Sequence, residues 1–147
     1  MEKFELNEAE MRIWHMWKGS FQTIFGRVIK ELTESTGLSE ADYGVLDRLA
    51  LLGNGDLRQQ ELADSMDWEK SRLSHHLTRM EKRGLVTRRP IDTDRGVQVI
   101  ITSAGQLALD EARPIVSKAI QKFFLDQLTD QDIESITKLA ERAKAYS

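Results

Sequence analysis

Three observations predict a mainly α-helical fold with a small β-hairpin. Apolar residues recur at helical spacing in both terminal segments, two short helical segments joined by a tight turn lie in the middle, and two runs of strand character follow. A chain of 147 residues has the length of one domain. Its 40% hydrophobic and 31% charged residues are typical of a globular protein. The sequence therefore predicts a single domain over residues 1–147.

The first helix is expected over residues 7–35, with Gly37 as its stop. Its apolar residues lie at helical spacing: Trp14, Trp17, Phe21, Ile24, Phe25, Val28 and Leu32. Ser39 then caps a second helix, and Asp42 is placed to complete a capping box. The Gly-Asn-Gly run at residues 53–55 ends this helix. Its buried stripe is expected to consist of Tyr43, Leu46, Leu49 and Ala50.

The middle of the chain has a helix-turn-helix pattern. A short helix is expected over residues 57–65, with Leu62 and Ala63 inward and a turn at residues 66–67. Asp67 is a favourable N-cap for a helix from Trp68 to about Arg83, which Gly84 ends. One face of that helix is apolar, formed by Leu73, Leu77 and Met80. Two short helices joined by a tight turn, the second basic and rich in small polar residues, are typical of DNA-binding helix-turn-helix motifs.

A β-hairpin is expected directly after this motif. Its strands cover residues 85–89 and 97–101, Pro90 ends the first strand, and a polar turn covers residues 91–96. A hairpin attached in this way makes the helix-turn-helix a winged one.

Two further helices complete the chain. Thr102 caps a long helix that reaches about Leu128, with a kink expected at Pro114 because proline removes a backbone hydrogen bond. Thr129 caps the last helix, with Asp132 three residues on. The apolar stripe of that helix consists of Ile133, Ile136, Leu139 and Ala140.

Charge is segregated along the chain. Residues 69–95 hold eight basic and four acidic side chains, a net charge of +4, whereas the remainder carries −7. The overall formal charge of −3 hides this basic region. A local positive field suits a polyanion-binding surface. The alternative is an ordinary solvated face.

Composition excludes several kinds of site. The chain has no cysteine, which rules out disulfides, thiolate metal sites and cysteine nucleophiles. The N-terminal residues 1–10 are acidic and lack the apolar core of a secretory signal, and no apolar run approaches the ~18 residues of a membrane span. We therefore expect a cytoplasmic protein with no membrane partner.

The order and spacing of several motifs resemble the MarR family of bacterial winged-helix regulators. The runs that carry the resemblance are Leu38-Ser39-Glu40-Ala41-Asp42-Tyr43 with Val45-Leu46, Glu61-Leu62-Ala63, Ser71-Arg72-Leu73-Ser74, Arg79-Met80-Glu81-Lys82-Arg83-Gly84-Leu85-Val86, Asp92-Thr93-Asp94-Arg95 and Ile101-Thr102-Ser103-Ala104-Gly105. The resemblance implies a homodimer in which helices within residues 1–37 and 102–147 dimerise and residues 38–101 form a DNA-binding lobe. Surplus apolar residues near both ends allow this, although they can also pack within one chain: Phe4, Leu6, Phe123, Phe124 and Leu125.

The basic helix predicts a DNA-reading face. With Leu73, Leu77 and Met80 inward, we expect Ser71, Arg72, Ser74 and His75 to reach base edges from its N-terminal half. Phosphate contacts are expected from Lys70, Thr78, Arg79 and Lys82, and from Arg58 near the start of the preceding helix. For Arg83, Arg88 and Arg89, ordinary surface charge or internal ion pairing is an equal alternative. The resemblance also implies that Asp94 positions Arg95 for DNA at the wing. The second basic residue that often follows in the family is Gly96 here.

No catalytic or metal-binding constellation stands out. His75 and His76 are adjacent on a helix and therefore point about 100° apart, which suits no single metal ion. The chain has no Gly-rich phosphate loop and no nucleophile–base pattern. We expect no enzyme activity, no metal and no cofactor.

A small aromatic effector is the last expectation. The resemblance places a pocket between the first helix, the second helix and the lobe. Its candidate residues are Trp14, His15, Trp17, Tyr43, Asp47 and Arg48. The alternative, which we favour for the tryptophans, is packing in the core or in a dimer contact.

The predicted function is that of a dimeric regulator, most simply a repressor, that binds a palindromic operator in double-stranded DNA and is released by an aromatic or phenolic effector. The alternative function is a ligand-binding or protein-interaction module of the same fold without DNA binding.

Overall fold

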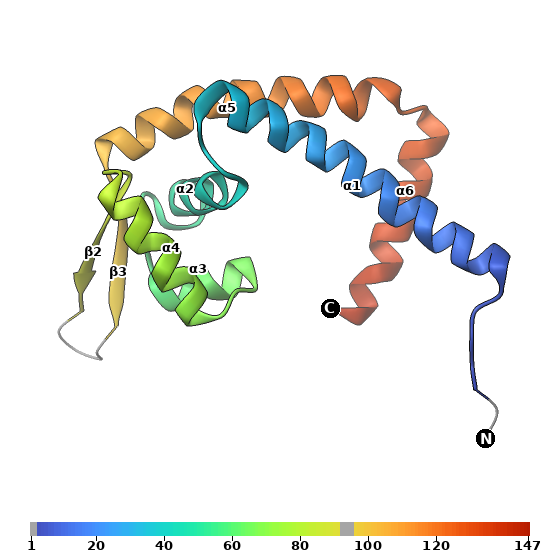
Figure 1. The fold of residues 1–147 in the computed structure, drawn as a ribbon, viewed down its shortest axis with the longest axis horizontal. Helices are drawn as coiled ribbons and strands as arrows, with labels where there is room; N and C mark the ends of the chain where they lie inside the picture. Colours follow the sequence, from blue (N-terminus) through green and yellow to red (C-terminus); the bar gives the residue numbers. More distant parts are fainter. Residues whose placement is uncertain (1–2, 92–95) are drawn as a thin grey trace. The chain divides into compact units, whose positions relative to one another are not determined.

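The computed structural model describes residues 3–91 and 96–147, and it confirms a mainly helical fold with a small antiparallel sheet (Figure 1). The elements are α1 (Glu8–Thr36), α2 (Glu40–Gly53), β1 (Asp56–Arg58), α3 (Gln59–Met66), α4 (Lys70–Lys82), β2 (Val86–Pro90), β3 (Val97–Ile101), α5 (Ser103–Phe123), α6 (Asp130–Ala143) and the short 3-10 turns η1 (Leu125–Gln127) and η2 (Lys144–Tyr146).

The chain forms two compact units. The central unit is Glu31–Val116, and the terminal unit combines Met1–Lys30 with Ser117–Ser147. Their borders fall inside α1 and α5, whereas the sequence places the borders of the DNA-binding lobe at residues 38 and 101. The predicted division into dimerisation helices and lobe stays a prediction.

The predicted helix ends are set by local hydrogen bonds. Ser39 and Asp42 form the full capping box at the start of α2, and Thr129 and Asp132 form a second one at the start of α6. At the end of α2, Asn54 adopts the left-handed conformation with φ 52°, and its N–H donates to the Leu49 carbonyl. Short-range sequence signals therefore predicted these ends correctly.

The sheet contains a strand that the sequence did not reveal. Residues 57 and 58 were expected at the start of a helix, but β1 pairs with β3, and Leu57 lies opposite Val99 in the buried layer. The strand order is β1-β3-β2. A three-residue strand is too short to show alternation in the sequence, so its pairing partner decides its conformation.

The turn between α3 and α4 also differs from the prediction. Asp67 was expected to cap the following helix, but it is the left-handed C-cap of α3 with φ 53°, and its N–H donates to carbonyls of that helix. The N-cap of α4 is Glu69, so Trp68 lies in the turn rather than in the helix. At the other end of the chain, α5 ends at Phe123 and not near Leu128, because the chain continues into η1.

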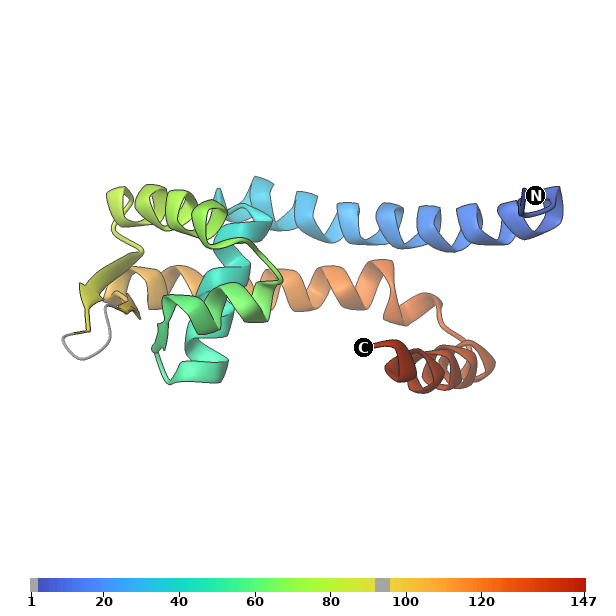
Figure 2. The same ribbon diagram turned by 90° about the horizontal axis from the view of Figure 1, so that it is seen from below.

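The core lies in the central unit. Its fully buried large side chains come from α1, α2, α3, α4, the sheet and α5: Leu32, Val45, Leu46, Leu49, Leu62, Leu73, Leu77, Met80, Val86, Val99 and Leu109. Figure 2 shows α2, α3 and α4 gathered around this region from a second direction. The sheet, α2 and α3 thus hold α4 from behind and leave its other side at the surface.

Candidate nucleic-acid interface

The outer face of α4 is a polar, basic surface supported by a buried one. Leu73, Leu77 and Met80 are fully buried, as the 100° spacing predicts. The predicted contact residues on this helix are exposed, apart from the half-buried Ser74: Lys70, Ser71, Arg72, His75, Thr78, Arg79 and Lys82. The structure therefore presents the predicted face to solvent, and the contacts with DNA stay predictions.

Arg72 is held by a neighbouring aromatic ring. Its guanidinium lies 3.7 Å from the centroid of the Trp68 ring, a cation–π contact in which the flat guanidinium stacks on the indole. Trp68 stands four residues before Arg72, at the end of the preceding turn. This contact limits the rotamers of a predicted base-reading side chain before any ligand arrives.

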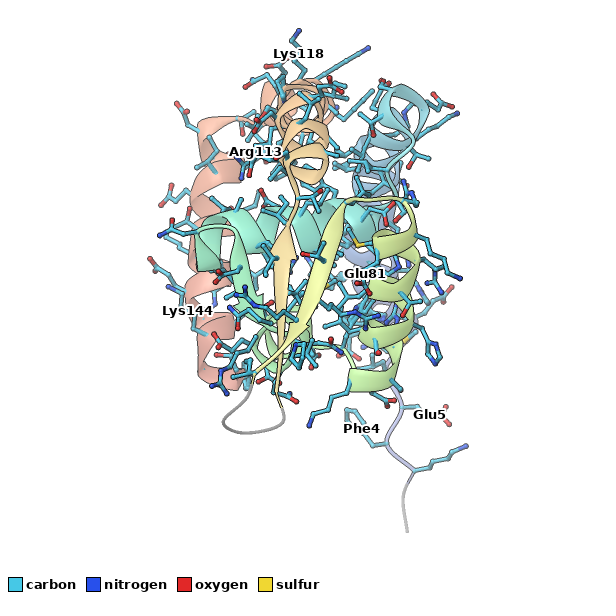
Figure 3. The ribbon with its side chains drawn as sticks, turned by 90° about the vertical axis from the view of Figure 1, so that its left-hand side faces the viewer. Phe4, Glu5, Glu81, Arg113, Lys118 and Lys144 are labelled. Carbon is cyan, nitrogen blue, oxygen red and sulfur yellow. The ribbon has the colours of Figure 1, made fainter. Side chains whose placement is uncertain are left out.

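Arg88 links the hairpin to α4. Its Nε donates to Glu81 at 2.7 Å, Nη2 donates to the Thr78 hydroxyl at 2.7 Å, and Nη1 donates to the Ser74 hydroxyl at 3.2 Å. Figure 3 shows Glu81 on α4 beside the strands of the hairpin. The sequence left open whether Arg88 contacts DNA or is an ordinary surface charge or part of an internal ion pair, and the structure pairs it with Glu81. This pairing fixes β2 against the helix and orients two of the predicted contact residues.

Behind the outer face, a polar cluster joins α4 to α2. His76 is 8% exposed and Asp42 is 2% exposed. Nε2 of His76 lies 3.0 Å from Oδ1 of Asp42, although its direction is not that of a well-formed hydrogen bond. The other carboxylate oxygen accepts a 2.6 Å hydrogen bond from Nη1 of Arg83. On the far side of the imidazole, Nη2 of Arg79 lies 3.2 Å from Nδ1.

Burial and neighbouring charges shift both titratable groups of this cluster. Burial lowers the pKa of His76 below its ordinary 6.5; the Asp42 charge opposes this effect, and Arg79 and Arg83 add to it. Burial alone would raise the pKa of Asp42, but hydrogen bonds from Arg83 and Ser39 outweigh it and hold the pKa below its ordinary 3.8. At neutral pH the cluster therefore contains a neutral imidazole beside a carboxylate.

The sheet adds two arginines to the basic surface. Arg58 at the end of β1 and Arg89 in β2 are both opposite Gln98 of β3, so the three side chains share one face of the sheet. Arg58 and Arg89 are both exposed. The hairpin backbone continues to a hydrogen bond from the N–H of Ile91 to the carbonyl of Gly96. The predicted wing residues Asp94 and Arg95 lie outside the described residues.

Residues 38–95, which hold α2, α3, α4 and β2, match the model of the MarR family. Two transcriptional regulators of that family from Streptomyces coelicolor are each 27% identical to this chain. AbsC has a TM-score of 0.84 over 97% of this chain and 99% of its own. The second, solved in complex with DNA, has a TM-score of 0.87 over 97% of this chain and 90% of its own. Residues 38–95 thus match the MarR family, and the chain has the fold of MarR family transcriptional regulators over nearly its whole length.

A more distant likeness shows the fold alone. An organohalide sensing transcriptional regulator, in its 2,4-dichlorophenol bound form, is 22% identical with a TM-score of 0.80, over 100% of this chain and 86% of its own. A comparison with curated proteins gives no match.

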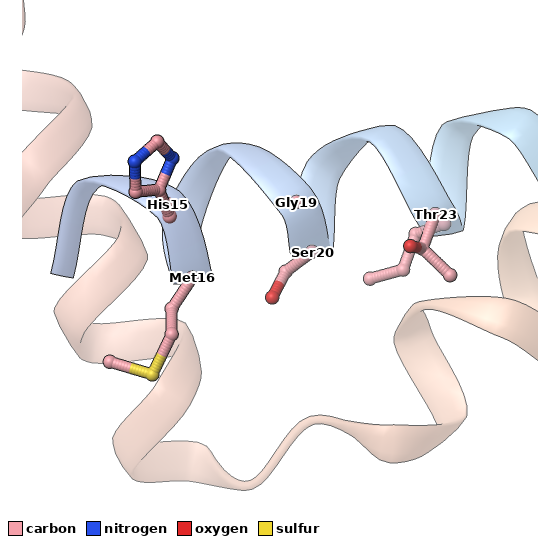
Figure 4. Close-up of a pocket in the computed structure, with 6 residues that line it drawn as sticks. His15, Met16, Gly19, Ser20 and Thr23 are labelled. Atoms are coloured by element: carbon pink, nitrogen blue, oxygen red, sulfur yellow. The ribbon is translucent and has the colours of Figure 1, made fainter. Parts of the chain in front are cut away.

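The predicted effector residues fall in different units. Trp14, His15 and Trp17 belong to the terminal unit, and Tyr43, Asp47 and Arg48 belong to the central unit. The two indole rings lie 5.5 Å apart and are about half exposed. Of these residues, His15 lines an open depression of about 420 Å³ along α1. Met16 and Ser20 also line it and project from the same helix (Figure 4). The effector site stays a prediction.

Two of the three predicted effector residues of the central unit already have partners. Asp47 accepts a hydrogen bond from Nη2 of Arg113 at 3.1 Å, and Arg48 donates to the Gly44 carbonyl at 3.1 Å. Burial raises the pKa of the Tyr43 phenol, and the charge of Asp47 adds to this effect.

In residues 3–91 and 96–147, no group of three or more His, Asp or Glu side chains is arranged to hold a metal ion. Over the same residues, no helix is long and apolar enough to cross a membrane.

Sequence reasoning missed Trp68 and His76 as parts of this surface. Trp68 was placed inside the helix, and His76 was considered only as a metal ligand. One signal was available, because Trp68, Arg72 and His76 are spaced by four residues and therefore lie along one side of a helix.

Proposed function

We propose that this chain is a sequence-specific DNA-binding transcriptional regulator, acting as a repressor on a palindromic operator. The observation that carries the proposal is the exposed basic face of α4 over a fully buried apolar face. A side chain such as Arg72 can make a bidentate contact to guanine in the major groove, whereas Lys82 offers a point charge to a phosphate. The related regulator solved with DNA supports this assignment.

The proposed regulator is a homodimer formed through its terminal helical regions. Large apolar side chains of the terminal unit are exposed within one chain: Ile13, Met16, Phe21, Ile133, Ile136 and Leu139. An apolar surface of this extent is typical of a protein–protein interface. A second copy of the chain would cover it, and a dimer carries two copies of α4, which matches the two-fold symmetry of a palindrome.

An aromatic or phenolic effector is the proposed signal for release. Trp14 and Trp17 offer aromatic surface beside the depression that His15 lines. A related fold binds 2,4-dichlorophenol, so this phenol serves as a probe of the class. Replacement Trp14→Ala should weaken the response of DNA binding to the probe more than it weakens DNA binding itself. An unchanged response in both Trp14→Ala and Trp17→Ala would leave packing as their role.

The test of DNA binding is a fluorescence-anisotropy titration with the duplex that lies directly upstream of the gene. We expect tight binding to this duplex, weaker binding to a scrambled duplex of equal length, and a steep loss of affinity with salt. Equal affinity for both duplexes would contradict sequence-specific regulation. Absence of binding at low salt would favour the alternative, a ligand-binding or protein-interaction module of the same fold.

A further inference from the structure

His76 occupies a central place in the surface just described. It belongs to α4 but faces away from the exposed side, and its two ring nitrogens and its ring edge each meet a different group. Asp42 of α2 lies at Nε2, Arg79 of α4 lies at Nδ1, and the Trp68 ring packs edge-on at 5.9 Å between centroids. Two of these contacts, with Arg79 and with Trp68, lead to different parts of the proposed DNA-binding face.

The Arg79 contact fixes the tautomer of the imidazole. A guanidinium can only donate hydrogen bonds, so Nδ1 must carry a lone pair where Nη2 of Arg79 approaches at 3.2 Å. The single proton of the neutral ring is then on Nε2, the nitrogen that faces the Asp42 carboxylate. Arg83 holds the other carboxylate oxygen at 2.6 Å, so Asp42 is itself fixed. Asp42 of α2 therefore orients the imidazole. The imidazole in turn orients Arg79, which belongs to the same helix, α4.

The Trp68 contact extends the same arrangement to Arg72. The Trp68 ring contacts both the imidazole and the Arg72 guanidinium, whose central carbon lies 3.7 Å from its centroid. Removal of the imidazole would take away one support of the indole and with it the platform on which Arg72 lies. His76 is thus connected to one predicted base-reading arginine through Trp68 and to one predicted phosphate-binding arginine directly.

We propose that His76 is a positioning residue that preorganises Arg72 and Arg79 for DNA, an inference that rests on the proposed DNA-binding function. Two arginines held in place lose less conformational freedom when they bind, and this gain appears as affinity. Protonation of the imidazole puts a proton on Nδ1, which can then no longer accept from Arg79. The charged and titratable groups that face the ring are Asp42 from α2 and Arg79 and Arg83 from α4, and no additional carboxylate replaces the lost acceptor among the contacts described.

Two replacements separate the parts of this role. In His76→Gln the side-chain amide can still reach toward Asp42, but both the Nδ1 acceptor and the ring are lost. In His76→Phe the ring is kept against Trp68, and only the polar contacts are lost. We expect His76→Gln to lose affinity and base preference together, and His76→Phe to lose affinity while base preference, which depends on Arg72, is retained.

The experiment measures the dissociation constants of the parent and both variants on the upstream duplex and on a scrambled one, from about pH 8 to pH 5. Near pH 8 we expect His76→Gln to bind the upstream duplex about five- to tenfold more weakly than the parent. The difference should shrink as the pH falls through the lowered pKa of His76, because the parent itself then carries a protonated His76. In an Arg79→Ala background, His76→Phe should have little further effect, since both changes remove the same contact.

Two controls make the result decisive. Val99→Ala, a fully buried core residue of the sheet, measures what simple loss of stability does to binding, and it should give no pH-dependent difference from the parent. Nitrogen-15 NMR of the imidazole rings should report the Nε2–H tautomer for His76 near pH 8.

Three results would overturn the inference while leaving the proposed function intact: a His76→Gln affinity within twofold of the parent near pH 8, a difference that is the same at every pH, or an Nδ1–H tautomer. A parent chain that binds neither duplex would overturn both the inference and the proposed function.

Discussion

Arg72 and Lys82 lie on the same exposed face of α4 but in different surroundings. Arg72 is near the start of the helix and stacks on Trp68, whereas Lys82 is the last helical residue. A stacked, planar guanidinium at the N-terminal half of the helix is suited to a base edge. A flexible ammonium at the other end is suited to a phosphate.

Replacement of these two side chains should therefore have different effects. Arg72→Ala should cost ~1–3 kcal/mol of binding free energy on the upstream duplex and should relax preference at one base pair in each half-site. Lys82→Ala should weaken binding to all duplexes similarly and should reduce the salt dependence by about one charge per subunit. Titrations of both variants at several salt concentrations on matched and scrambled duplexes check this. If both variants bind like the parent, the assigned face is wrong.

The Asp42–His76 pair makes stability depend on pH. The pKa of His76 is below 6.5 in the folded chain and close to 6.5 when unfolded. As the pH falls below 6.5, the unfolded chain takes up the proton first, so the free energy of unfolding decreases until the folded imidazole is also protonated. The lowered pKa of Asp42 acts in a separate, more acidic window: its stabilising effect is present above 3.8 and is lost as the pH falls through its folded pKa.

Chemical denaturation at several pH values should separate the pH window of His76 from the more acidic window of Asp42. Between about pH 7 and pH 5 the free energy of unfolding of the parent should decrease, and His76→Gln should flatten that part of the curve because it removes the titrating group. Asp42→Asn should instead change the curve in the more acidic window. An equal slope for the parent and His76→Gln between pH 7 and pH 5 would contradict the assignment.

At the scale of elements, the start of α5 is held close to the start of the hairpin. Thr102 donates its backbone N–H to the Leu85 carbonyl at 3.1 Å and its hydroxyl to the Gly84 carbonyl at 2.6 Å. In the first turn of the helix, Gly105 faces the Leu85 backbone so closely that a Cβ atom would overlap its carbonyl oxygen. The absence of a side chain here lets the helix begin directly against the strand.

Gly105→Ala should therefore destabilise the chain by about 1–3 kcal/mol, the usual cost of inserting an extra group into a packed region. Gly26→Ala is the matched control, because its added Cβ would meet no atom within 4 Å. That control should stabilise the helix by up to about 1 kcal/mol, since alanine has the higher helix propensity. Thermal unfolding of both variants measures the difference. Equal melting temperatures would show that the close approach of Gly105 to Leu85 does not affect stability.

At the scale of the whole molecule, the exposed apolar side chains of α1 and α6 bear on the oligomeric state of the protein. Ile133, Ile136 and Leu139 form the stripe expected from the sequence, yet each remains between 44% and 49% exposed in one chain. An apolar stripe that is left about half exposed by the described residues of its own chain is suited to burial against another surface.

Light scattering should accordingly give twice the chain mass of 16.9 kDa at micromolar concentration. The double replacement Ile136→Glu with Leu139→Glu should shift the mass toward one chain, because charged side chains are costly to bury. Leu51→Glu, which changes an exposed leucine of the central unit, should leave the mass unchanged. A parent mass of one chain would contradict the dimer.

The sequence by itself determined the order of the main elements, most helix ends and the inward face of α4. These features depend on interactions within a few residues, such as the Ser39–Asp42 box and the spacing of Leu73, Leu77 and Met80. The exposed and basic residues of α4 could be predicted for the same reason.

Only the tertiary structure decided the features that join distant residues. Leu57 becomes a strand because Val99 pairs with it, and Arg88 turns inward because Glu81 and the hydroxyls of α4 lie within its reach. His76 looks like any helical histidine in the sequence, and its role depends on Asp42, 34 positions earlier in the chain. The spacing of apolar residues predicts which side of a helix or strand is buried, but it does not predict which other element packs against that side. The orientation of a buried polar side chain depends on the groups of that other element, so it is known only from the tertiary structure.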